Sequence, residues 1–173
     1  DQFSDFVRFT ADLSFFADPE MRLIFEFDDD GGWAKYAGFD NVLVKGIGNS
    51  TNIILENFND CSRHNGWDTE IATGNRGWQF GRLTNDDAVV NSMNGSCFAH
   101  FDDNGIGDEW QQAPPSRTLL YSPWIDGTQF AEYFLEFDVT FRKNIQEERL
   151  EIGVWNGNKF RIVETYFNDI GGP

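Results

Sequence analysis

Apolar and polar residues alternate over many short segments of this chain, which is the pattern of half-buried β-strands. The alternation is cleanest in residues 134–142, where Leu135, Phe137 and Val139 alternate with charged and hydroxyl side chains. No helical period persists in residues 61–112, which read as loops around one strand. The pattern predicts an all-β protein, an antiparallel β-sandwich. The expected strands lie within residues 6–16, 21–28, 39–44, 52–58, 96–101, 117–124, 134–142, 150–155 and 160–167.

Residues 22–44 form the most structured part of this pattern. Phe25 and Phe27 fall on one face of a strand, which the acidic, glycine-rich run at 28–32 brings to an end. The returning strand carries Asp40 among apolar neighbours. A carboxylate in such a place is costly unless it is hydrogen-bonded or binds a cation.

The composition indicates a folded, strongly acidic protein. Of the 173 residues, 40% are hydrophobic and 16% aromatic, which suffices for one sizeable core. The net charge of −16 repels phosphate backbones and anionic lipids, so neither nucleic acid nor insertion into a membrane is expected. The charge favours divalent cations as partners. The alternative is that it only keeps an extracellular protein soluble.

Cys61 and Cys97 are the only cysteines. An even pair in an acidic chain rich in Asn and Gly favours one disulfide in a secreted protein over two buried thiols. The sequence has no apolar run long enough for a membrane span. It has neither an initiator Met nor a signal peptide, so we expect that a leader was removed or that the chain belongs to a longer protein. The expected location is extracellular or at the cell surface.

Several motifs combine along the chain. An E-x-F-x-D strand at 56–60 is followed by Gly66-Trp67, and a strand ending in S-P precedes the long strand at 134–142. Residues 96–103 begin with small and aromatic side chains and end in two acidic residues. Residues 30–42 contain a D-G-G-W turn followed by the sequence D-N-V. Together they resemble the jelly-roll modules of secreted bacterial surface proteins, the MAM-like group with cleaved-adhesin domains and the "choice-of-anchor" modules of Bacteroidetes.

The order of these motifs differs from that of the group. The motifs that close such a module fall within residues 1–46, whereas those that open it begin after a linker at 47–51 and continue through 52–173. In one interpretation residues 1–46 fold onto the same chain as a circular permutation, since domain termini are often close together. In the other, which we favour, they complete a neighbouring unit by strand donation.

Calcium is the expected ligand, since it binds six to eight oxygens from carboxylates, amides and backbone. Asp40 and Glu56 are the first candidates, because each lies among apolar residues, one in the closing motif and one in the opening motif. The resemblance implies that these strands are neighbours. Asp60, Asp102 and Asp103 are candidates of second rank. In the alternative, these carboxylates accept backbone N–H groups or face solvent.

No catalytic motif is present, and we expect no enzymatic activity. His64 and His100 are more simply explained as structural residues than as members of a triad. The sequence therefore predicts a calcium-stabilised structural unit of an extracellular fibre, filament or long adhesin, which joins copies of itself head to tail. The alternative is a carbohydrate- or protein-binding module, in which Trp and Tyr side chains stack on glycans.

Overall fold

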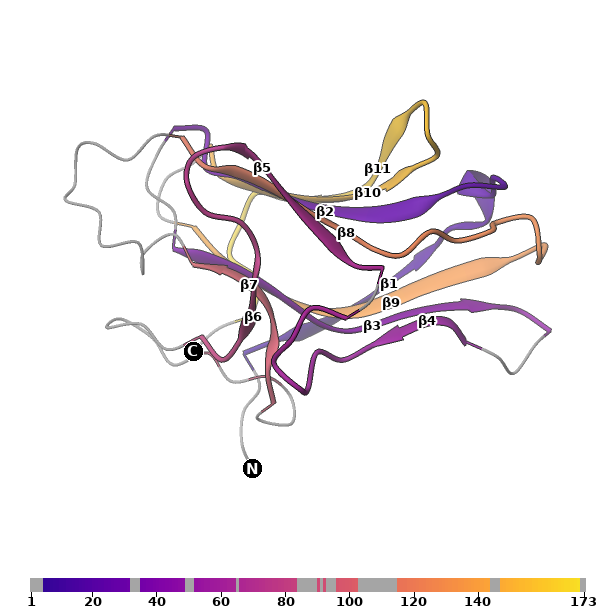
Figure 1. Cartoon of the computed structure of the whole chain (residues 1–173), viewed down its shortest axis with the longest axis horizontal. Coiled ribbons are helices and arrows are strands. Elements are labelled where there is room, and N and C mark those ends of the chain that lie inside the picture. The colour runs from indigo at the N-terminus through magenta and orange to yellow at the C-terminus, as the bar shows by residue number, and fades with distance from the viewer. Residues whose placement is uncertain are drawn as a thin grey trace.

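The computed structural model describes residues 5–31, 35–48, 52–64, 66–83, 90, 92, 96–102, 115–143 and 147–171. Within these ranges the chain forms two antiparallel sheets packed face to face, which confirms the predicted β-sandwich (Figure 1). The described part contains no α-helix, only the 3-10 turn η1 (Ser14–Phe16). Across the same ranges, no helix is long and apolar enough to cross a membrane.

The six-stranded sheet has the order β1-β9-β3-β7-β6, and β4 pairs with β3 as well. Its strands are β1 (Val7–Asp12), β3 (Tyr36–Gly46), β4 (Asn52–Glu56), β6 (Gln79–Gly81), β7 (Phe98–Asp102) and β9 (Tyr133–Arg142). The five-stranded sheet has the order β11-β10-β2-β8-β5. Its strands are β2 (Arg22–Asp28), β5 (Asp68–Thr73), β8 (Arg117–Tyr121), β10 (Arg149–Trp155) and β11 (Phe160–Tyr166).

The core lies between the two sheets and is built from the alternating positions. Phe25 of β2 is fully buried and lies 4.3 Å from Phe39 of β3, measured between ring centroids. It also meets Phe137 of β9 edge to face, at 5.6 Å. Aromatic contacts of this kind add to the stabilisation from buried apolar area. The two-residue period of the sequence therefore identifies the inward faces of the central strands correctly.

The structure differs from the sequence prediction at the sheet edges. The first strand ends at Asp12, because the Asp12 carboxylate accepts hydrogen bonds from the backbone and hydroxyl groups of Ser14 and so begins η1. Strands β5 and β6 were not expected. Every residue of β5 except Thr69 is exposed, so this edge strand lacks the apolar alternation on which the prediction relied.

Residues 7–46 supply β1, β2 and β3, and all three strands lie within the two sheets of their own chain (Figure 1). Strand β3 is central, with β9 along one side and both β7 and β4 along the other. If copies exchanged these strands, the same strand pairs would form between two chains instead of within one. The strand pairing does not distinguish the two arrangements, so strand donation stays a prediction. The two ends of the described chain also meet, since Gly171 lies so close to the carbonyl of Asp5 that a side chain would not fit.

Candidate functional site

The candidate site lies where β3 changes its partner. Residues 36–39 of β3 pair with β7, and residues 42–45 pair with β4. Between these two ladders, the pairing with β9 is interrupted by a bulge that begins at Asp40. Asn41 in the bulge has a φ of 51°, a left-handed conformation that is uncommon for residues other than glycine. The bulge therefore places Asp40 at the junction of β3, β4 and β9, next to the start of β7.

The carboxylate of Asp40 is fully buried and only half satisfied. Its Oδ1 accepts the backbone N–H of Asn41 at 2.8 Å. Its Oδ2 is buried and has no hydrogen-bond partner among the described residues. Burial, together with the nearby carboxylates of Asp138 and Glu56, raises the pKa of Asp40 to about 7, although the N–H of Asn41 and the charge of Arg8 act in the opposite direction. Buried oxygens of this kind are rare in native proteins and point to a missing partner.

Asp138 lies opposite Asp40 on β9 but has a full set of partners. Arg8 of β1 binds both of its oxygens, with an Nη2–Oδ2 distance of 3.0 Å. The side-chain amide of Asn41 donates to the same Oδ2 at 2.7 Å. The charge of Asp138 is thus balanced within the protein, whereas that of Asp40 is not.

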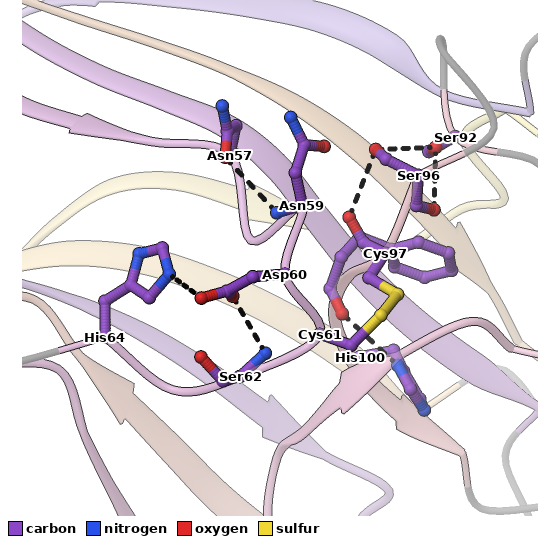
Figure 2. The surroundings of a disulfide bond; sticks show 11 residues. Asn57, Asn59, Asp60, Cys61, Ser62, His64, Ser92, Ser96, Cys97 and His100 are labelled. Carbon is purple, nitrogen blue, oxygen red and sulfur yellow. Dashed lines mark hydrogen bonds and ion pairs between the residues drawn. A yellow bond between two sulfur atoms is a disulfide. The ribbon is translucent and has the colours of Figure 1, made fainter.

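Glu56, at the end of β4, is the second buried carboxylate beside Asp40. Its Oε1 accepts the N–H of Phe58 at 2.8 Å, and its Oε2 lies 2.6 Å from His64 Nδ1. The other ring nitrogen of His64 lies 2.8 Å from the carboxylate of Asp60, as Figure 2 shows. Only the imidazolium can donate to both carboxylates at once. The contact with Asp60 raises the pKa of His64, and Glu56 acts in the same direction.

The disulfide joins the two segments that border this junction. Cys61 follows β4 and Cys97 precedes β7, and the bond between them confirms the pairing predicted from the sequence (Figure 2). Phe58 and Cys61 have φ values of 49° and 60°, so the backbone between Glu56 and the disulfide turns sharply. The disulfide holds this turn against the start of β7.

The structure brings two of the predicted metal ligands together, Asp40 and Glu56. Asp60 is in the same loop as Glu56, but one of its oxygens contacts His64 and the other accepts the N–H of Ser62. Asp102 pairs with Tyr36, four residues from Asp40 along β3 and so about 13 Å away. Asp103 lies outside the described residues.

These residues can hold a cation only with help from other oxygens. Among the described residues, no group of three or more His, Cys, Asp or Glu side chains is arranged to bind a metal ion. Calcium, however, readily takes backbone carbonyls, amide oxygens and water alongside one or two carboxylates. Oδ2 of Asp40, which has no partner among the described residues, is the atom that fits such an ion. Glu56 would bind the ion only by giving up its contact with His64.

Some residues of the site escaped the sequence prediction. Asp138 belongs to the polar face of the strand at 134–142, and that pattern alone suggests exposure, yet it is fully buried. Its neighbour Asn41 carries no periodic signal at all. The one available hint was a basic residue on the polar face of another strand, such as Arg8, because buried acids are normally paired. His100 is a packed histidine of β7, whose pKa is lowered by burial.

Among the described aromatic residues that are candidates for glycan stacking, more are buried than exposed. Trp67, Trp78 and Tyr133 are buried in the core. Tyr121 and Trp155 are half-buried, and Trp124 is 55% exposed, with its ring 4.8 Å from the guanidinium carbon of Arg22. Trp33 and Trp110 lie outside the described residues. The buried rings among them stabilise the fold.

No protein-family model, no curated protein and no solved structure gives a significant match to this chain. What the chain does must therefore be inferred from its own residues, foremost the arrangement around Asp40.

Proposed function

We propose that this chain is a non-catalytic structural unit of an extracellular fibre, filament or long surface adhesin. It belongs, in this proposal, to the jelly-roll modules related to the MAM-like and cleaved-adhesin groups, with its motifs in rotated order. Copies join head to tail by strand donation, and calcium stabilises the joint. No nucleic acid or membrane is involved.

The position of β3 carries this proposal. This strand pairs with β9, β7 and β4, so a sandwich without it is split through its larger sheet and exposes core and unpaired backbone. It enters the sheet from residues 1–46, separated from β4 only by the short connection after Gly46. A short hinge beside a central strand is the arrangement from which domains exchange strands between copies.

The ends of the chain support the same arrangement. Strand β1 pairs with residues 134–139 of β9, and Ile170 pairs with Phe141 farther along that strand. Both pairings are antiparallel, so the C-terminal segment and β1 follow one another along one edge of β9. In an exchange, the β1 of a neighbouring copy would take the place of β1 on this edge, next to the C-terminal segment.

The calcium part of the proposal rests on Asp40 and Glu56. Asp40 belongs to the segment that would be donated, and Glu56 to the segment that would receive it. An ion held between them would offset the cost of two buried carboxylates and tie donor to acceptor. The same ion would close the unit upon itself if the strands stay within one chain.

The oligomeric state tests the proposal. We expect the purified chain to form particles longer than one unit as its concentration rises in calcium, seen by size-exclusion chromatography and electron microscopy. Chelation should shorten them. A monomer that stays compact and stable at every concentration, with and without calcium, would refute assembly by strand donation.

A further inference from the structure

A pocket of about 250 Å³ lies at one end of the sandwich, between η1 and the hairpin of β10 and β11. Figure 1 shows both elements at the same end of the molecule. The hydrogen bond from Asn156 Nδ2 to Asp18 Oδ2, at 2.9 Å, connects the two walls. Pockets for drug-sized ligands start at roughly 300 Å³, so this one suits a single small ring. It is remote from Asp40 in the chain and shares no residue with that site.

The pocket is basic within a very acidic protein. Lys159 and Arg161 line it, and neither forms an ion pair with any described carboxylate. Asp18, the one acid in the lining, is bound to Asn156. The lining thus carries two basic side chains against one acidic side chain, although the chain as a whole has a net charge of −16. The two basic side chains offer charge-assisted hydrogen bonds to a carboxylate.

The pocket also has an aromatic rim. Phe15 lines it and is 86% exposed, the most exposed of the large hydrophobic side chains described. Its backbone carbonyl lies 3.5 Å from Arg161 Nη1, so the ring and the guanidinium belong to the same rim. Val154, which is buried, forms an apolar part of the lining.

We propose that this pocket binds a hexuronate, the sugar unit of acidic polysaccharides. The carboxylate binds Arg161 and Lys159, and the C–H face of the ring lies against Phe15. A simple anion such as phosphate would use the cations but leave Phe15 without a function. An acidic peptide would need an extended groove, whereas this pocket takes one ring.

The overall charge of the protein limits which ligands serve as probes. The acidic surface repels a long polyanion that runs along it, and at physiological salt this repulsion acts over distances of about 8 Å. A short ligand confined to the pocket meets little of that surface. Short ligands are therefore the proper test. We choose D-galacturonic acid, its linear trimer, neutral D-galactose and hexaglutamate, titrated into the full chain in about 150 mM salt.

Two pocket variants and two matched controls complete the design. Arg161→Gln and Phe15→Ala remove the charge and the ring, while Lys35→Gln and Phe167→Ala make the same changes at exposed residues outside the pocket. All four positions lie at the surface or the pocket rim, and circular dichroism verifies folding.

We expect saturable binding of galacturonic acid or its trimer, measured by calorimetry or by NMR shifts. Arg161→Gln should weaken it about tenfold or more, as expected for loss of a charge-assisted hydrogen bond. Phe15→Ala should also weaken it, through loss of the ring contact, and each control should leave it unchanged. If only the trimer binds, the ligand is a chain residue rather than a free sugar. Absence of binding at millimolar concentration, equal binding of galactose or hexaglutamate, or intact binding in both pocket variants would each overturn the proposal.

Discussion

Asp40 and Asp138 lie directly opposite each other on β3 and β9, but only Asp138 has a cationic partner. Arg8 and Asn41 satisfy Asp138, while Oδ2 of Asp40 is left without a partner among the described residues. Two buried carboxylates so close together cannot both be ionised without compensation. The pair therefore makes the junction of β3, β4 and β9 sensitive to charge.

Asp40→Asn should stabilise the metal-free protein at pH 8. The variant no longer ionises a buried group, although its amide gains an unsatisfied N–H. The balance predicts a gain of about 1 to 3 kcal/mol in the free energy of unfolding. Denaturant titration in EDTA measures it. A loss of stability would mean that the Asp40 carboxylate is compensated by a group other than a metal.

The same residue predicts a pH dependence in EDTA. The pKa of Asp40 is raised to about 7 from an unfolded value of 3.8, so the folded state binds more protons between these values. Stability should therefore fall as the pH rises from about 4 to about 7 and then level off. The raised pKa of His64 adds a separate loss that begins near pH 6.5, its unfolded value, and continues above it. The difference between parent and Asp40→Asn isolates the contribution of Asp40, and identical profiles would exclude it.

Calcium should raise the melting temperature of the parent. An ion present at a hundredfold excess over its Kd adds about 2.7 kcal/mol, which corresponds to several degrees. Asp40→Asn and Glu56→Gln should lose this shift. Asp102→Asn is the matched control, because Asp102 lies at the end of β7 that is farther from Asp40. The calcium-induced shift should persist in this variant. An equal shift in all three variants would place the ion elsewhere.

Arg8→Met should destabilise the protein by about 2 to 4 kcal/mol, because it leaves the buried carboxylate of Asp138 without a cation and with only the amide of Asn41 as a partner. Adding Asp138→Asn should restore much of the loss, since the neutral amide needs no cation. Thermal melts of the two single variants and the double variant form the cycle. Additive effects would show that the ion pair contributes nothing to stability.

Loss of the disulfide should cost about 2 to 4 kcal/mol, since Cys61 and Cys97 are 36 residues apart in the sequence. We also expect Cys61→Ser with Cys97→Ser to weaken calcium binding, because the bond holds the turn after Glu56 against β7. Melts of the double variant with and without calcium measure both effects. A full calcium shift in the variant would separate the disulfide from the site.

Strand donation can be trapped between chains. Thr10 of β1 lies opposite Glu136 of β9, at a separation suited to a disulfide. A mixture of Thr10→Cys and Glu136→Cys chains, refolded together and oxidised, should form cross-linked heterodimers if β1 is exchanged. The control pair, Glu151→Cys and Thr165→Cys, joins neighbours within the β10–β11 hairpin and should give none. Cross-linking of neither pair would indicate that β1 stays in its own chain.

The sequence by itself determined the inward faces of the central strands. Phe25 and Phe27 repeat every two residues because one face of their strand is covered by the other sheet, and this local periodicity needs no tertiary information. The isolated cysteine pair likewise indicated its own disulfide. The apolar surroundings of Asp40 and Glu56 correctly indicated that both carboxylates are buried.

Only the tertiary structure decided which strands are neighbours. The burial of Asp138 depends on Arg8, which is distant in the chain, and the change of partner at Asp40 depends on where β7 and β4 end. Edge strands such as β5 escape the pattern because they cover little apolar surface. The basic pocket at Phe15 also arises from a contact between η1 and a far hairpin. Periodicity reports that a face is covered, whereas the identity of what covers it comes from long-range packing.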